Sequence, residues 1–335
     1  MDLRDSDGAE APSVAVAIPV KDEEAALPGC LRALDEAAAR WPGRVTVVAM
    51  ANECRDGSVA LLARTRLRHA DLAWRAVSLL PGARHAGWAR RLAFDAAADL
   101  LERPNDLLLS TDADTLVAPD WIARNAACLA DCEAVAGRAV TIAAERAATG
   151  AVGRRRLDQL GRYYTLLDHL RASREPAGSE GWPRHYYEGG ASIALRLGLY
   201  RRIGGAPTPS LAEDRALFDR IRLNEGRVRH PVDVRVFTSC RLHGRAPGGM
   251  ADALAGWVAQ DEDTPLHEAY RVAAALDPDT ATAADQLTFR RLPAAIAEAQ
   301  RLVRRLRSGA PPQVEAVALA PLLARHEEPV AQKAA

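Results

Sequence analysis

Short aliphatic runs alternate along the first half of the chain with longer stretches in which apolar residues recur every three or four positions. Runs this short, bounded by turn-forming residues, are typical of strands buried on both faces, and the longer stretches are typical of amphipathic helices. The expected strand–helix pairs are 13–20 with a helix to about 40, 44–50 with 59–67, 74–79 with 85–101, and 106–111 with 119–130. Four such pairs in succession predict an α/β fold built on a parallel sheet.

The second half of the chain is predicted to add few strands and many helices. A further strand is expected at 134–141 and a late one at 232–239, with helices between them at 143–174, 197–205 and 211–226. Beyond 249 the sequence is alanine-rich and helical to about 308. These patterns divide the chain into a flexible N-terminal tail at 1–13, a main domain at 14–249, a helical extension at 250–308, and a linker, short helix and tail at 309–335.

Polar residues follow the expected strands at the ends where ligands bind in parallel α/β sheets. The loops 21–24, 52–58 and 112–115 all fall at the carboxyl ends of strands, so they should meet at one edge of the sheet. The third loop contains Asp112 and Asp114, separated by one alanine. Two carboxylates in a tight turn after a strand can hold one divalent cation, although the same triplet also occurs as a capped turn before a helix.

Charge and cysteine content narrow the classes of protein. Lys+Arg and Asp+Glu both number 44, so the net charge is zero and no general attraction to nucleic acid is expected. The five cysteines include no CxxC pair and indicate neither a disulfide framework nor a zinc knuckle, which fits a reducing cytoplasm. The N-terminus lacks an apolar signal segment, and no stretch of about 18 apolar residues predicts a transmembrane helix. We expect a cytoplasmic protein.

Several motifs together resemble the family 2 glycosyltransferases, which have a GT-A fold. They are IPVKDEEAALPGCL, the NECRDGS loop, HAGWARRLAFDAA, LLLSTDADTLVAPDWI, EGGASIALRLGLYRRIGG and LAEDRALFDRI, in this order within residues 14–249. The resemblance implies a GT-A catalytic domain with a mostly parallel, Rossmann-like sheet, a nucleotide-diphospho-sugar donor and a divalent metal, Mn²⁺ or Mg²⁺. It further implies a hexosyltransferase that acts on an acceptor hydroxyl, usually with inversion at the anomeric carbon.

The resemblance also assigns roles to individual residues. Asp112 and Asp114 match the D-x-D motif that holds the metal, and His243 resembles a histidine that serves some of these enzymes as a further ligand. Imidazole suits Mn²⁺ better than Mg²⁺. Glu213 and Asp214 match the catalytic E-D pair, with Asp214 as the base that takes the acceptor's proton. The nucleotide-sugar would be bound by Pro19, Val20, Glu23, Asn52, Asp56, Arg90, Asp112 and Arg245, and the acceptor near Gly189 and Gly190.

Each assignment has a structural alternative that the residues alone leave open. Acids in the first turn of a helix stabilise its N-terminus whatever their chemistry, and His243 beside a glycine turn could be a hydrogen-bonded loop residue. Arg241 and Arg245 could pair with a diphosphate or be exposed cations. Asn52 stands where the family often has aspartate, and an amide both donates and accepts, so the identity of the base is left open.

Two other functions compete with sugar transfer. A nucleotidyltransferase would share the α/β core and the acidic loop but should carry a glycine-rich basic loop after the first strand, which IPVKDEEAA lacks. A non-catalytic sugar-nucleotide-binding protein would need neither the D-x-D motif nor Asp214. The sequence does not identify the acceptor. The basic segment 297–309 permits contact with a membrane surface, although packing on the main domain is the favoured role.

Overall fold

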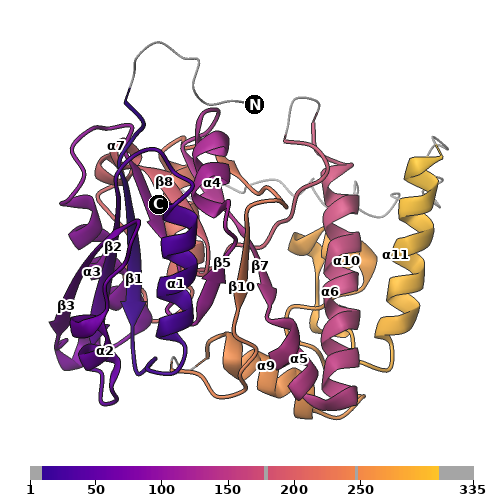
Figure 1. Ribbon diagram of the computed structural model, residues 1–335. Coiled ribbons are helices and arrows are strands. Elements are labelled where there is room, and N and C mark those ends of the chain that lie inside the picture. Colours follow the sequence, from indigo (N-terminus) through magenta and orange to yellow (C-terminus); the bar gives the residue numbers. More distant parts are fainter. Residues whose placement is uncertain (1–9, 177–179, 246–247, 309–335) are drawn as a thin grey trace, which may run out of the picture.

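A seven-stranded mixed sheet forms the centre of the larger part of the molecule (Figure 1). The computed structural model describes residues 10–176, 180–245 and 248–308. In spatial order the strands are β3 (Asp71–Val77), β2 (Val45–Asn52), β1 (Val14–Val20), β4 (Leu107–Ser110), β8 (Ile193–Arg196), β6 (Ala134–Ala136) and β9 (Val228–Arg229). Strands β3, β2, β1 and β4 run parallel, as the sequence predicts, and β8 runs antiparallel to both β4 and β6. The α/β fold class is therefore confirmed.

Two apolar layers cover the faces of this sheet, which explains why its inner strands are apolar along their whole length. In β1 the larger side chains, such as Val16 and Ile18, point to one layer and Ala15 and Ala17 to the other. The first layer includes side chains from α1 (Leu27–Ala38), α2 (Ser58–Arg64) and α4 (Trp121–Leu129). The second includes side chains from α3 (Ala86–Ala98), α7 (Leu197–Arg202) and α8 (Glu213–Leu223). A short 3₁₀ turn, η1 (Pro81–Ala83), precedes α3.

A second, three-stranded sheet lies beside the first, in the order β5 (Thr115–Val117), β10 (Arg235–Thr238) and β7 (Arg138–Thr141). The late strand expected at 232–239 is confirmed as β10. The single strand expected at 134–141 is wrong, because β6 and β7 belong to different sheets and separate at Gly137. A Cβ at Gly137 would overlap the Ser192 side chain, so glycine permits the close approach of the chain there.

The helices of the C-terminal part pack around one long helix, α6 (Gly150–Ala172), which follows α5 (Ala143–Ala148). Helix α11 (Leu292–Arg307) lies beside α6 (Figure 1), and both contribute to an apolar cluster separate from the two sheet layers. The remaining elements here are α9 (Met250–Ala259), α10 (Val272–Leu276), η2 (Pro278–Thr280) and η3 (Ala283–Asp285). The extension expected at 250–308 thus shares its core with a helix from the segment before 249.

Two predicted segments fall outside the described residues. They are most of the N-terminal tail, 1–9, and the linker, short helix and tail at 309–335. Among the helices of the described chain, none combines the length and the apolar composition needed to cross a membrane.

Candidate active site

The three polar loops expected at the carboxyl ends of the strands meet in the structure. After β1, the backbone N–H of Glu23 donates to Ser58 Oγ at 2.9 Å, and the N–H of Glu24 donates to Asp56 Oδ2 at 2.9 Å. Arg241, in the loop after β10, joins the first loop to the third, because it pairs with Glu23 at 2.5 Å and with Asp114 at 3.0 Å. The convergence predicted from the strand order is therefore confirmed.

Asp112 and Asp114 lie between β4 and β5, and each faces a different arginine. Asp112 Oδ1 accepts a hydrogen bond from Arg90 Nη2 at 2.9 Å, whereas Asp114 Oδ2 lies 3.0 Å from Arg241 Nη2. The Asp112 side chain is one-third exposed, and that of Asp114 is 15% exposed. The cationic partners of the acidic pair in this structure are thus arginines that belong to the chain itself.

Arg90 connects the acidic loop to the start of α8. Its side chain is buried on α3 and donates to Glu213 Oε1 at 3.0 Å as well as to Asp112. Two further bonds reach Ser110 Oγ at 3.2 Å and the Gly190 carbonyl at 3.1 Å. Burial alone would lower the pKa of Arg90, but the attraction of Asp112 and Glu213 outweighs it, so the pKa is raised. Arg90 therefore stays charged and holds three segments of the chain together.

Asp214 lies in the first turn of α8 and bonds in two directions. Its Oδ1 accepts the N–H of Arg215 in its own helix at 2.8 Å, while Oδ2 accepts the N–H of Gly190 at 2.8 Å. Ala212 precedes the helix in the left-handed region, with φ 55°, and so turns the chain into α8 at this point. Burial, followed by the negative charge of Glu213, raises the pKa of Asp214. A carboxylate with a raised pKa is a stronger base than an exposed one.

The Asp112–Asp114 pair has the donor chemistry of a divalent-cation site. One oxygen of each faces an arginine, and Asp112 Oδ2 accepts no hydrogen bond from the described residues. Burial, followed by the negative charge of Asp112, raises the pKa of Asp114 to about 6, although Arg241 opposes the shift. The arginines thus leave carboxylate charge uncompensated, which a hard cation bound to carboxylate oxygens would neutralise. The residues fit such an ion.

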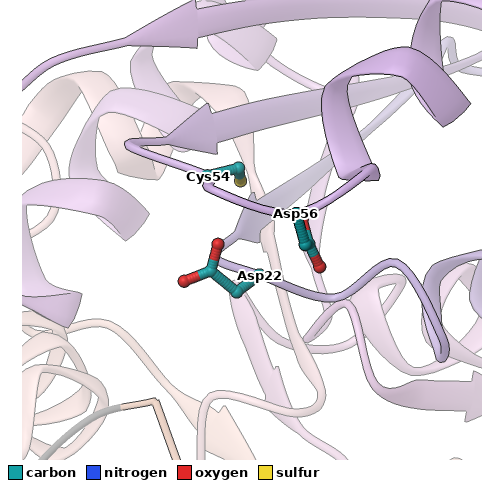
Figure 2. Close-up of side chains that lie close together, drawn as sticks. All are labelled: Asp22, Cys54 and Asp56. Carbon is teal, nitrogen blue, oxygen red and sulfur yellow. The ribbon is translucent and has the colours of Figure 1, made fainter.

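A different group of metal-type donors lies on the loops after β1 and β2, where Figure 2 shows Asp22, Cys54 and Asp56 together. One donor atom from each lies within 4.8 Å of the others. The carboxylate oxygens of this group already stabilise the loops through hydrogen bonds. Asp22 Oδ1 accepts the N–H of Arg55 at 2.6 Å, and both Asp56 oxygens accept backbone N–H groups. Sequence reasoning missed this group. The position of the two loops, which follow the neighbouring strands β1 and β2, could have indicated that these residues lie together.

His243 and Arg245 lie in the exposed loop after β10. In the described part of the chain, no choice of one ligand atom from each of Asp112, Asp114 and His243 brings all three within 4.8 Å of one another. Arg245 donates to the Asp22 carbonyl at 2.8 and 3.0 Å, so it ties this loop to the one after β1.

Asn52 ends β2 and is 7% exposed. Its Oδ1 is buried and has no hydrogen-bond partner in the part of the chain that the structure describes. Val20 is buried and Pro19 half-buried at the end of the neighbouring strand β1. An unpaired buried acceptor is unfavourable unless a ligand or an ordered water supplies the donor.

Gly189 and Gly190 lie between Tyr187 and the start of β8. A Cβ at Gly190 would overlap the guanidinium of Arg90, and one at Gly189 would overlap the ring and hydroxyl of Tyr187. Both glycines therefore make room for side chains of the protein. Sequence reasoning did not single out Tyr187, since nothing in its local pattern distinguishes it from the tyrosine before it.

Comparison with solved structures supports the fold. The mannosyltransferase PcManGT from Pyrobaculum calidifontis, in complex with GDP-Man and Mn²⁺, matches with a TM-score of 0.50 and 20% identity, covering 95% of this chain and 81% of that one. TarS 1-349 of S. aureus in complex with UDP-GlcNAc matches with a TM-score of 0.47 and 14% identity, covering 93% and 77%. No protein-family model and no curated protein sequence matches this chain. The first similarity confirms the GT-A type of the fold.

Proposed function

We propose that this chain is a metal-dependent family 2 glycosyltransferase. It would move a sugar, a hexose by our reading of the motifs, from a nucleotide-diphosphate donor to an acceptor hydroxyl with inversion. The observation that carries the proposal is the buried side chain of Arg90, which bonds both Asp112 of the acidic loop and Glu213 next to Asp214. A donor-binding acid and a candidate base are thereby held in one rigid network on a GT-A fold.

On the donor side, Asp112 and Asp114 would hold Mn²⁺ or Mg²⁺, with His243 as a further ligand. When bound, the cation would neutralise the charge that develops on the departing diphosphate. The unpaired Oδ1 of Asn52 supports a base site at the end of β2, because uracil, thymine and guanine all present an N–H donor. Pro19, Val20, Glu23, Asp56 and Arg245 would complete the nucleotide side.

On the acceptor side, Asp214 would take the proton of the attacking hydroxyl. The acceptor oxygen forms a bond to the anomeric carbon, the bond from that carbon to the diphosphate oxygen breaks, and the diphosphate leaves with the electron pair. Attack on the face opposite to the diphosphate gives inversion. Burial raises the pKa of Asp214, and the charge of Glu213, which Arg90 holds in place, adds to this shift and so strengthens the base.

A donor screen tests this proposal. Thermal shifts of the protein with UDP-, GDP- and dTDP-sugars should show one strongly preferred nucleotide, with a larger shift when Mn²⁺ is present. Asp114→Asn should remove the Mn²⁺-dependent part of the shift. Asp71→Asn is the matched control, since Asp71 is an exposed carboxylate on the edge strand β3. Absence of any shift with all three nucleotide-sugars in the wild-type protein would contradict the proposal.

A further inference from the structure

The backbone of the two glycines beside Asp214 is covered by side chains of the protein itself. Arg90 fills the space next to Gly190, and the hydroxyl end of Tyr187 fills the space next to Gly189. An acceptor therefore cannot lie directly against this backbone while both side chains stay in place. The group that it would meet on the Gly189 side is Tyr187.

Tyr187 packs its hydroxyl end against Gly189 and is still partly exposed to solvent. Its side chain is an exposed aromatic group, with 40% of the residue accessible, even though the hydroxyl end packs on Gly189. Burial of that end, followed by the negative charges of Asp214 and Asp112, raises the pKa of Tyr187. The hydroxyl end of the ring lies against Gly189, next to the glycine whose N–H donates to Asp214.

A second exposed apolar residue shortly precedes Asp214 in the chain. Leu211 is 56% exposed and lies three residues before Asp214. Tyr187 and Leu211 come from the two segments that the Gly190–Asp214 hydrogen bond joins. Exposed apolar groups on segments that also carry a polar centre are typical of sites that bind a ligand with one apolar face and several hydroxyls.

The charges around Asp214 favour a neutral acceptor over an anionic one. Arg90 is bonded to Asp112 and Glu213, and Arg215 makes a bidentate pair with Glu268 at 2.8 and 3.0 Å. Arg241 is likewise engaged, by Glu23 and Asp114. An acceptor phosphate would meet carboxylates here and find these three arginines already paired.

We propose that the ring of Tyr187 binds the acceptor, and that the acceptor presents a sugar whose C–H face packs on this ring. This inference rests on the proposed glycosyltransferase function and names the chemical class of the acceptor. A pyranose offers a flat apolar face to the ring and hydroxyls to Asp214, which is the combination that this part of the site can bind.

Saturation-transfer NMR with methyl glycosides tests the inference without depending on turnover. The probes are methyl glucoside, galactoside, mannoside and N-acetylglucosaminide, each added to the protein with the nucleoside diphosphate that gives the largest thermal shift. At least one glycoside should bind the wild-type protein and Tyr187→Phe, and its affinity should fall by about 5-fold or more in Tyr187→Ala. Trp74→Ala is the control, because Trp74 is a comparably exposed aromatic residue on the outermost strand β3.

Gly189→Ala provides a second variant in which the tyrosine is kept but its ring must shift. We expect a loss of glycoside affinity comparable to that of Tyr187→Ala, with nucleotide binding retained. Equal glycoside affinity in wild type and Tyr187→Ala would overturn the inference. So would a wild-type protein that releases nucleoside diphosphate from a donor yet binds none of the glycosides, and this result would leave the proposed function standing. A wild-type protein that binds no nucleotide-sugar would overturn both.

Discussion

The backbone N–H of Gly190 donates a hydrogen bond to the carboxylate of Asp214, with 2.8 Å between the nitrogen and Oδ2. The carbonyl of the same glycine accepts a bond from Arg90 at 3.1 Å. One residue thus fixes the position of both the candidate base and the buried arginine that links it to the acidic loop. This connection explains why the segment before β8 belongs to the site although it contributes no charged group at that point.

The first prediction concerns this glycine. In Gly190→Ala the new methyl group would overlap the Arg90 guanidinium, so Arg90 must move and weaken its bonds to Asp112 and Glu213. We expect the free energy of unfolding to fall by about 1–3 kcal/mol, as for other overpacked sites. Urea denaturation of the purified variant measures this change.

Gly161→Ala is the matched control. Gly161 lies within α6, and a Cβ there would meet nothing within 4 Å. This substitution should raise the free energy of unfolding by about 0.5–1 kcal/mol, because alanine loses less backbone entropy in a helix. Similar effects of the two substitutions would contradict the role given to Gly190.

The second prediction uses the unpaired oxygen of Asn52. If this oxygen accepts an N–H of the nucleotide base, Asn52→Ala should weaken nucleotide binding by about 10-fold, the value of roughly one hydrogen bond. The substitution should not lower the free energy of unfolding by the amount that the loss of a hydrogen bond would cause. The reason is that Oδ1 has no partner among the described residues. Calorimetric titration with the preferred nucleoside diphosphate measures the affinity. Asn125→Ala serves as the control, because Asn125 also has a buried, unpaired Oδ1 but lies on α4, and its substitution should leave the affinity unchanged.

The third prediction is a dependence of stability on pH. Burial raises the pKa of Asp168 on α6 to about 6, in spite of the nearby positive charge of Arg171. Between the unperturbed value near 3.8 and about 6, the folded protein binds more protons at this site than the unfolded chain does. The contribution to stability is therefore complete below pH 3.8, falls as the pH rises towards 6, and is lost above that value.

Asp168→Asn removes this titration. The free energy of unfolding of the variant relative to wild type should rise by on the order of 1–3 kcal/mol between pH 4 and pH 8. Urea denaturation at both values measures the difference. Asp219→Asn is the exposed control, since solvent screens that charge. A difference between Asp168→Asn and wild type that stays constant over this range would contradict the assigned titration.

The parallel part of the sheet could be predicted from the sequence, because β1, β2 and β4 are short apolar runs whose pattern is local. The meeting of the loops that contain Glu23, Asp56 and Asp112 follows from the same pattern, since the carboxyl ends of parallel strands share one edge. The resemblance to a known family then directed attention to Asp214, which is far from these loops in sequence.

The remaining features depend on contacts between distant residues, which local patterns do not encode. The break between β6 and β7 arises where Ser192 approaches Gly137, and the pairing of Arg241 with Asp114 joins a late loop to an early one. The same holds for Gly190 in the turn before β8, because a side chain there would overlap Arg90 of the distant helix α3. The sequence predicts that this glycine lies near the acceptor, and its contact with Arg90 becomes visible only in the structure.

The most direct measurement of the central claim is the turnover of Asp214→Asn. Asparagine keeps the shape of the side chain, and its one oxygen can still accept a backbone N–H, but it cannot take a proton. With saturating donor and an acceptor pool from a cell extract, the release of nucleoside diphosphate should fall by about 10² to 10⁴, the usual scale for the loss of a general base. Donor affinity, measured by calorimetry, should hardly change, and Asp219→Asn on the same helix should keep full turnover. Full turnover in Asp214→Asn with unchanged donor affinity would contradict the account and remove Asp214 from the mechanism.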